Sequence, residues 1–107
     1  MNLTRTLLTL AAATVSAMAQ PVSIPGHSHN DYEQARPLDL AIESGLRSVE
    51  VDVHLVDGEL LVAHDADEVV PGRTIESLYL APLHERHRTG SILPDRAELI
   101  LLVDFKT

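Results

Sequence analysis

The sequence has no cysteine and very few aromatic residues. Without cysteine no disulfide can hold the chain, and with only Tyr32, Tyr79 and Phe105 as aromatics the core must be built from Leu, Val, Ile and Ala. Basic residues are also scarce, because eight Lys and Arg stand against 16 Asp and Glu, giving a net charge of −8. This balance argues against nucleic acid as a partner, since binding a phosphate backbone needs basic surface. It suits a protein that holds a cation.

The first twenty residues contain no acidic side chain and have the pattern of a secretory signal peptide. Arg5 precedes the apolar stretch Leu7–Val15, and small residues follow with an A-x-A pattern at 17–19. The apolar stretch is too short to span a bilayer, so we expect no transmembrane segment after signal cleavage. Residues 1–19 are therefore predicted to be a signal peptide and 20–107 a secreted or periplasmic domain. A buried N-terminal helix is the alternative.

Apolar periodicity and turn residues predict a series of short strands and helices. The clearest strand has valines on one face and Glu50, Asp52 and His54 on the other. Asp57-Gly58 is a hairpin signal, and Gly45 is a helix C-terminal signal. The expected elements are a strand at 22–24, a helix at 38–44, strands at 48–56 and 59–64, a short helix around 74–79, and a strand at 99–103.

This order of elements is typical of parallel α/β units. The last strand, Leu99–Val103, is an uninterrupted apolar run, which is typical of a strand buried on both faces of a sheet. Such a strand needs a neighbour on each side, and the sequence stops before a second neighbour. We therefore interpret the chain as a fragment of a larger α/β domain.

Polar residues gather where the predicted strands end, which is where barrel enzymes build their sites. Glu50 and Asp52 project to the same side of their strand, with Cα atoms about 6–7 Å apart. Two negative charges inside a sheet need a compensating cation or hydrogen-bond donors. Hard cations such as Ca²⁺ or Mg²⁺ prefer carboxylate and amide oxygens, which favours a divalent metal site. An exposed strand face is the alternative.

Histidines flank this carboxylate pair in the sequence. A three-residue hairpin loop at 56–58 would set His64 opposite Glu50, whereas a two-residue loop would turn His64 to the other face. We predict the longer loop. His27 and His29 form an H-x-H pair of the kind found in metal-dependent hydrolases. The alternative for His64 is a structural role. The alternative for the H-x-H pair is a polar loop with one buried histidine.

Three further residues complete the candidate site. Asn30 offers an amide oxygen suited to a hard cation. Asp104 on the last strand offers another carboxylate, although it could also be a simple strand-end cap. Lys106 offers a positive charge for a phosphate group. Together the candidates supply an acid, a base, metal ligands and an anion contact.

Five stretches of the chain, taken in order, resemble the PLC-like phosphodiesterase superfamily. They are Ser28–Tyr32, Val49–Val53, Asp57-Gly58, Leu61–Asp65 and Leu102–Lys106. The HSHNDY sequence is similar to the start of the subgroup named for altered inheritance of mitochondria protein 6. The resemblance extends from about Gly26 to Lys106. It implies that residues 20–107 are the N-terminal portion of a TIM-type (β/α)8 barrel, incomplete in this chain.

The resemblance also implies a role for each matching residue. The catalytic residues would be His29 and His64, the metal ligands Asn30, Glu50, Asp52 and Asp104, and the substrate-binding residues Lys106 and His27. Two departures stand out. Asp104 replaces the usual glutamate, which shortens the ligand by one methylene. The arginine of the H-R-G pattern found in glycerophosphodiesterases is missing, which leaves His27 and His29 in competition for the catalytic position.

The implied reaction is metal-dependent hydrolysis of a glycerophosphodiester or a phospholipid-type phosphodiester. One histidine would act as base and the other as acid, with Ca²⁺ or Mg²⁺ activating the nucleophile. The partner would be a phosphodiester small molecule or a lipid head group. The alternatives are an H-x-H amidohydrolase or PHP-type phosphoesterase with two or three transition metals, or a non-catalytic exported fragment. The particular substrate, the choice of metal and the oligomeric state are left open.

Overall fold

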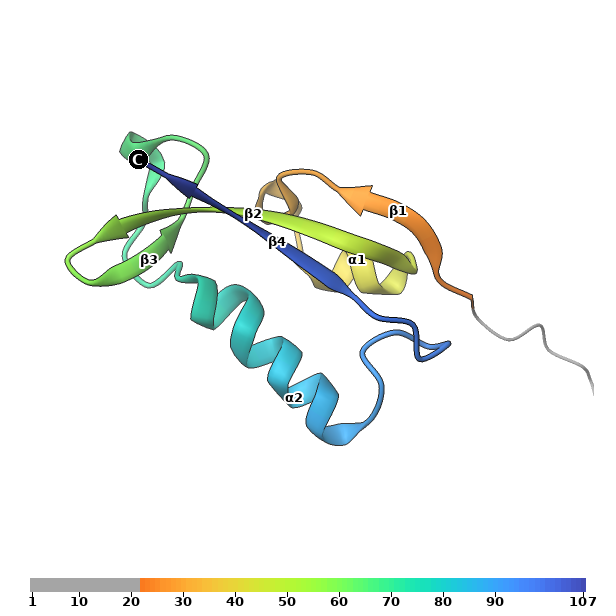
Figure 1. Cartoon of the computed structure of the whole chain (residues 1–107). Coiled ribbons are helices and arrows are strands. Elements are labelled where there is room, and N and C mark those ends of the chain that lie inside the picture. Colours follow the sequence, from red (N-terminus) through yellow and green to blue (C-terminus); the bar gives the residue numbers. More distant parts are fainter. Residues whose placement is uncertain (1–21) are drawn as a thin grey trace, which may run out of the picture.

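The computed structural model describes residues 22–107, which form a four-stranded mixed sheet with helices on one face (Figure 1). The central strand is β2, Leu46–Val56. The strands β1, Ile24–Ser28, and β4, Ile100–Lys106, pair with it in parallel, and β3, Glu59–Val62, pairs with it in antiparallel. The mixed α/β class is therefore confirmed, while the barrel stays a prediction. The predicted signal peptide lies outside the described residues.

The helical elements are short and lie between the strands. They are a 3-10 turn η1 at Asp31–Glu33, α1 at Asp39–Glu43, a 3-10 turn η2 at Ala66–Glu68, a π-helical turn η3 at Glu76–Leu80 and α2 at Ala81–Thr89. The predicted first helix is confirmed, and Gly45 follows it with a φ of 74°, as a left-handed residue at a helix end. Within residues 22–107 no helix is long and apolar enough to cross a bilayer.

The second helix is longer than the sequence indicates. The prediction ended near Tyr79, but η3 continues directly into α2. Pro82 lies in the first turn of α2, at the point where the π-helical hydrogen bonding of η3 gives way to the α-helix. The stretch His84–Arg88 makes up the second half of α2 and is mostly exposed, and its sequence lacks the apolar residues at helical spacing that would predict a helix.

The core forms between one face of β2 and the helices. Val49, Val51 and Val53 are fully buried against residues of α1, η3 and the loop before β4. Glu50, Asp52 and His54 lie on the opposite face, as the alternation of the sequence predicts. The helices therefore cover the valine face and leave the acidic face uncovered in this part of the chain.

The pairing of β2 leaves a gap on one of its edges. β1 pairs with residues 46–49, β3 with 53–56, and β4 with 48–54. Because β4 overlaps both of the other strands along β2, β1 and β3 must share the opposite edge. Figure 1 shows them at the two ends of β2. The edge beside Glu50 and Asp52 is therefore free for the loops that follow β1 and β3.

The predicted three-residue hairpin loop is wrong. Val56 pairs with Glu59, so the loop has two residues, Asp57 and Gly58, with φ values of 49° and 82°. Positive φ at both positions is the type I′ turn, whose twist matches that of the strands it joins. β3 also ends at Val62 rather than at His64. The position of His64 is therefore set by the chain after β3 and not by the ladder.

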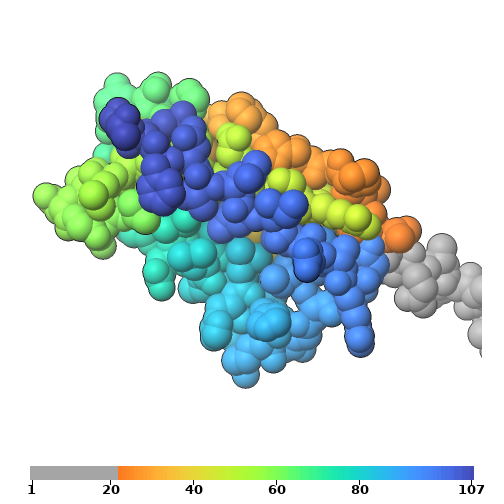
Figure 2. Space-filling model, viewed as in Figure 1, coloured from red at the N-terminus to blue at the C-terminus, as the bar shows by residue number. Residues whose placement is uncertain are grey.

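The prediction that the last strand is buried on both faces is also wrong for this chain. Ile100, Leu102 and Phe105 are 55%, 48% and 63% exposed. Within residues 22–107, β4 pairs with β2 alone. Figure 2 shows β4 at the surface, with a strip of β2 visible between it and β1.

Asp95 ties the start of β1 to the loop before β4. Its Oδ2 accepts hydrogen bonds from the backbone N–H of Ser23 at 2.8 Å and from the Ser23 hydroxyl at 2.7 Å. Its Oδ1 accepts one from the N–H of Ala97 at 3.0 Å. These hydrogen bonds, led by the Ser23 hydroxyl and aided by the charge of Arg47, lower the pKa of Asp95 to about 2.

We expect the variant D95N to melt at a lower temperature than the unaltered chain at pH 7. The stabilisation by an Asp with a lowered pKa is complete above the unfolded value of about 3.9 and is lost as the pH falls through the folded value. The difference between the two proteins should therefore shrink as the pH falls below about 3.9 and vanish only below the folded value of about 2. Melting curves followed by circular dichroism at several pH values test this. An equal difference at every pH would contradict it.

Candidate functional site

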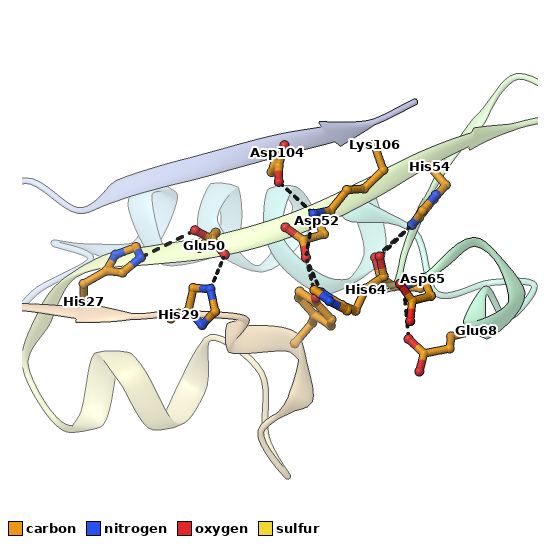
Figure 3. Close-up of polar contacts among 12 residues, drawn as sticks. His27, His29, Glu50, Asp52, His54, His64, Asp65, Glu68, Asp104 and Lys106 are labelled. Atoms are coloured by element: carbon orange, nitrogen blue, oxygen red, sulfur yellow. Dashed lines mark hydrogen bonds and ion pairs between the residues drawn. The ribbon is translucent and has the colours of Figure 1, made fainter.

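Glu50 and Asp52 stand on the uncovered face of the sheet, beside the gap on the edge of β2. In the parallel register, Glu50 lies next to Leu102 of β4, and Asp52 lies next to Asp104. Figure 3 shows both carboxylates on β2, with His27 reaching them from β1, and His29 and His64 from the loops after β1 and β3. Residues from four distant stretches of sequence therefore meet at this face.

Both histidines of the H-x-H pair reach Glu50. His29 Nε2 is 3.4 Å from Oε1, and His27 Nε2 is 3.8 Å from Oε2. The other ring nitrogen of His27, Nδ1, is 2.8 Å from the hydroxyl of Ser48, its register neighbour on β2. His27 is thus fixed from two sides, whereas the side chain of His29 is 72% exposed against 37% for His27.

Asp52 is only 1% exposed, and within residues 22–107 all of its side-chain polar contacts are made by one carboxylate oxygen, Oδ2. Oδ2 accepts a hydrogen bond from the Tyr32 hydroxyl at 2.6 Å, and it lies 3.2 Å from His64 Nδ1 and 3.8 Å from Lys106 Nζ. The other oxygen, Oδ1, is buried and has no hydrogen-bond partner among the described residues. An unpartnered buried carboxylate oxygen is costly, so the environment of this atom differs from that of an ordinary core carboxylate.

His64 reaches Asp52 although the hairpin has the short loop. The N–H of Ala63 still donates to the carbonyl of Asp52 at 3.3 Å, and the chain then bends at His64. His54 supports this bend, with Nε2 at 3.1 Å from the carbonyl of Ala63 and 3.3 Å from that of His64. The bend, rather than the register, turns the His64 ring toward the acidic face.

The surroundings of His64 favour its protonated form. The hydrogen bond to Asp52 raises the pKa of His64 above its usual range, and the charge of Asp65 adds to this. Partial burial and the charge of Lys106 act in the opposite direction without cancelling the rise. The imidazole of His64 is therefore suited to donate a proton near neutral pH.

Lys106 and Asp104 enter the site from β4. Lys106 Nζ lies 3.0 Å from Asp104 Oδ2, and this contact chiefly raises the pKa of Lys106. The two residues thus form an ion pair next to Asp52, and the side chain of Asp104 is about half exposed. Asn30 lies at the start of η1 with a left-handed φ of 48°, and its side chain makes no capping hydrogen bond.

The carboxylates fit a hard cation that keeps part of its water shell. Within residues 22–107 no three His, Asp or Glu side chains gather closely enough to hold a metal ion by themselves. A magnesium ion, however, is commonly bound through only one or two carboxylates and retains several waters. The unpartnered Oδ1 of Asp52, with Glu50 two residues away on the same face, meets that need.

Comparison with known families decides the class of the protein. Residues 15–91 match the model of the AIM6-like phosphodiesterase domain. The chain belongs to this family. The resemblance to the subgroup named for altered inheritance of mitochondria protein 6 is thereby confirmed, and the family name indicates a phosphodiesterase-type domain. The match ends before β4, so the placement of Asp104 and Lys106 beside Asp52 rests on the sheet register and on the contacts of Lys106.

Curated relatives of the AIM6-like chain are fungal and much longer. The altered inheritance of mitochondria protein 6 homolog of Arthroderma benhamiae is 41% identical over 68 residues, which cover 58% of this chain and 22% of the relative. The protein from Kluyveromyces lactis is 41% identical over 76 residues, covering 66% and 18%. That from Lachancea thermotolerans is 45% identical over 60 residues, covering 53% and 14%. The chain thus spans about a fifth of their length or less, and no solved structure matches it.

The HSHNDY segment of this AIM6-like domain contains a structural carboxylate that sequence analysis missed. Asp31 is fully buried, and its Oδ1 accepts a hydrogen bond from the Ser28 hydroxyl at 2.6 Å. Its Oδ2 accepts hydrogen bonds from the Tyr79 hydroxyl at 2.7 Å and the N–H of Leu38 at 2.6 Å. Asp31 therefore fixes the loop after β1 to α1 and η3, which holds His29 near β2.

Tyr32 was likewise missed as a site residue in the AIM6-like domain. The sequence offers it only as an aromatic residue for the core, and it is indeed buried. Its hydroxyl, however, makes the shortest contact with Asp52. No local pattern signals this contact, because its partner lies on a strand 20 residues further along the chain.

Proposed function

We propose that this chain supplies the metal-binding and acid–base residues of a metal-dependent phosphoric diester hydrolase. The observation that carries the proposal is the carboxylate pair on β2, in which Glu50 contacts His29, Asp52 contacts His64, and the buried Oδ1 of Asp52 has no partner among the described residues. The phosphodiesterase name of the family supports the same reaction class. A phosphodiester small molecule or a lipid head group is the proposed substrate.

Glu50 and Asp52 are the proposed ligands of Ca²⁺ or Mg²⁺, and Asn30 and Asp104 are the further oxygen donors that we propose would complete the set. When bound, the ion would lower the pKa of the attacking water or hydroxyl and neutralise charge on the phosphate. A cation also offsets the repulsion between an anionic substrate and a chain with a net charge of −8.

Of the three histidines, one is assigned to substrate positioning and two are assigned to proton transfer. His27 is held by Ser48 and Glu50, so we assign it to substrate positioning. His29 is more exposed and contacts only Glu50 among the described residues, so we assign it as the base that accepts the proton of the nucleophile. His64, with its raised pKa, is assigned as the acid that protonates the leaving oxygen.

Lys106 is the proposed contact for a phosphate oxygen. Its ammonium group lies between Asp52 and Asp104 on the uncovered sheet face, and its raised pKa keeps it charged. Secretion or export to the periplasm is part of the proposal and rests on the signal-peptide pattern of residues 1–19.

We expect hydrolysis of bis(p-nitrophenyl) phosphate by the protein to stop in excess EDTA and to return with Mg²⁺ or Ca²⁺. The reason is that the carboxylate pair acts on the substrate through the ion. The absorbance of the released p-nitrophenol measures the rate of hydrolysis. Unchanged turnover in EDTA would contradict metal dependence.

Two other outcomes of the same assay favour the alternatives. Restoration by Zn²⁺ but by neither Mg²⁺ nor Ca²⁺ would favour an H-x-H amidohydrolase or PHP-type site at His27 and His29, since imidazole suits zinc. Cation binding without turnover would favour a non-catalytic exported domain.

A further inference from the structure

We infer that Tyr32 is a positioning residue that orients the carboxylate of Asp52 toward the divalent cation. The inference rests on the proposed function, because it concerns the same metal site. It goes beyond that function in naming a residue that touches neither the cation nor the substrate but fixes the orientation in which the Asp52 carboxylate faces the cation.

The contacts of Asp52 carry the inference. Three donors crowd Oδ2, and the Tyr32 hydroxyl is the nearest of them at 2.6 Å, ahead of His64 at 3.2 Å and Lys106 at 3.8 Å. Oδ1 has no partner among the described residues. The terminal torsion of an aspartate is broad, so a carboxylate turns easily unless a hydrogen bond fixes it. The Tyr32 hydroxyl is the closest group that fixes it.

Tyr32 is a dependable donor because it stays neutral. The Tyr32 side chain is buried, and its hydroxyl has Asp52 Oδ2 as its one hydrogen-bond acceptor among the described residues. A phenol is protonated at neutral pH, so this hydroxyl donates its single proton to Asp52. His64 and Lys106 differ from it, since both are partly exposed and both are assigned to substrate chemistry.

The backbone of Tyr32 is itself anchored. Arg73 Nη2 donates to the carbonyl of Tyr32 at 3.1 Å, and the carbonyl of Arg73 accepts a hydrogen bond from the N–H of Val62 at 2.8 Å. Arg73 thus links the turn η1 to the end of β3. A residue that positions a metal ligand must itself be held in place. Hydrogen bonds to metal-ligating side chains commonly govern the affinity for the metal.

Tyr79 provides a matched control for Tyr32. It is also a buried tyrosine, and its hydroxyl also donates to a buried aspartate, Asp31 Oδ2, at 2.7 Å. The bond has the same chemistry and nearly the same length, but Asp31 is no proposed ligand. Loss of the hydroxyl at either tyrosine should destabilise the fold to a similar extent, while only the loss at Tyr32 should affect the cation.

The test is isothermal titration of Mg²⁺ and of Ca²⁺ into the metal-free 107-residue chain at pH 7, for the unaltered protein, Y32F and Y79F. We expect Y32F to bind the cation about 10–100-fold more weakly and Y79F to bind it as the unaltered chain does. Equal affinity in Y32F and the unaltered chain would overturn the inference and leave the proposed function intact. Absence of binding in the unaltered chain would overturn the proposed metal site and the inference with it.

A second variant keeps the test decisive if Y32F melts below the temperature of the titration. R73Q removes the guanidinium from the Tyr32 carbonyl and leaves the Tyr32 hydroxyl present. We expect it to weaken cation binding in the same direction, by a smaller factor than Y32F. A folded R73Q with unchanged affinity would then overturn the inference.

Discussion

Replacing His64 with alanine is expected to lower the rate of phosphodiester hydrolysis by the protein about 10²–10⁴-fold, the usual contribution of a positioned general acid. The same loss is expected for His29, the proposed base. The side chain of His29 is 72% exposed and that of His64 is 48% exposed, so the variants should remain folded. Initial rates with bis(p-nitrophenyl) phosphate, with far-UV circular dichroism as a folding check, measure the effect.

The matched control is H84A, which removes an exposed histidine on α2 far from the carboxylate pair in sequence and should leave the rate unchanged. The pH profile gives a further check. Since the pKa of His64 is raised, its protonated form persists above the ordinary histidine value of about 6.5, and the rate should fall only as the pH rises beyond that value. Undiminished turnover in both H29A and H64A would remove the acid–base assignment.

Replacing Asp31 with alanine is expected to cause the largest loss of stability of any single change at the HSHNDY segment. The change leaves the Tyr79 hydroxyl and the Leu38 N–H without their acceptor, and a buried donor left unpaired costs about 1–3 kcal/mol. The free energy of unfolding should therefore fall by about 3–5 kcal/mol, comparable to breaking a buried charged pair. That is a large part of the roughly 5–15 kcal/mol that holds a domain folded.

Urea denaturation of D31A and of the unaltered chain measures this loss. D67A is the matched control, because Asp67 is an exposed carboxylate in η2 and its removal should change the free energy of unfolding by no more than about 0.5 kcal/mol. D31N should lie between the two, since its amide oxygen still accepts one hydrogen bond. A D31A chain as stable as D67A would show that Asp31 does not hold the loop after β1.

The face of β2 could be predicted from the sequence because its signal is local. The valines and acids alternate within nine residues, and the structure keeps them on opposite faces. The loop of the hairpin between β2 and β3 was predicted wrongly. Asp57-Gly58 favours the two-residue turn that forms, whereas the prediction of a longer loop rests on the clustering of His64 with Glu50 and Asp52 that such a loop would produce. A bend after β3 brings His64 to Asp52 instead.

The supporting residues of the site could not be predicted, because their partners are distant in sequence. Tyr32 meets Asp52 across 20 positions, and Tyr79 meets Asp31 across 48. A tyrosine or an aspartate in such a segment looks the same whether it packs, caps or positions a ligand. The hydrogen bonds of Tyr32 to Asp52 and of Tyr79 to Asp31 become visible only in the folded structure.

The central claim is that the carboxylates of β2 hold one divalent cation, and a crystal structure of the protein grown with Mn²⁺ tests it most directly. Manganese binds the same oxygen ligands as magnesium and gives an anomalous signal that locates the ion. We predict a single anomalous peak in contact with Asp52 Oδ1 and the carboxylate of Glu50. A peak held by His27 and His29 away from Asp52, or no peak at this face of the sheet, would contradict the claim.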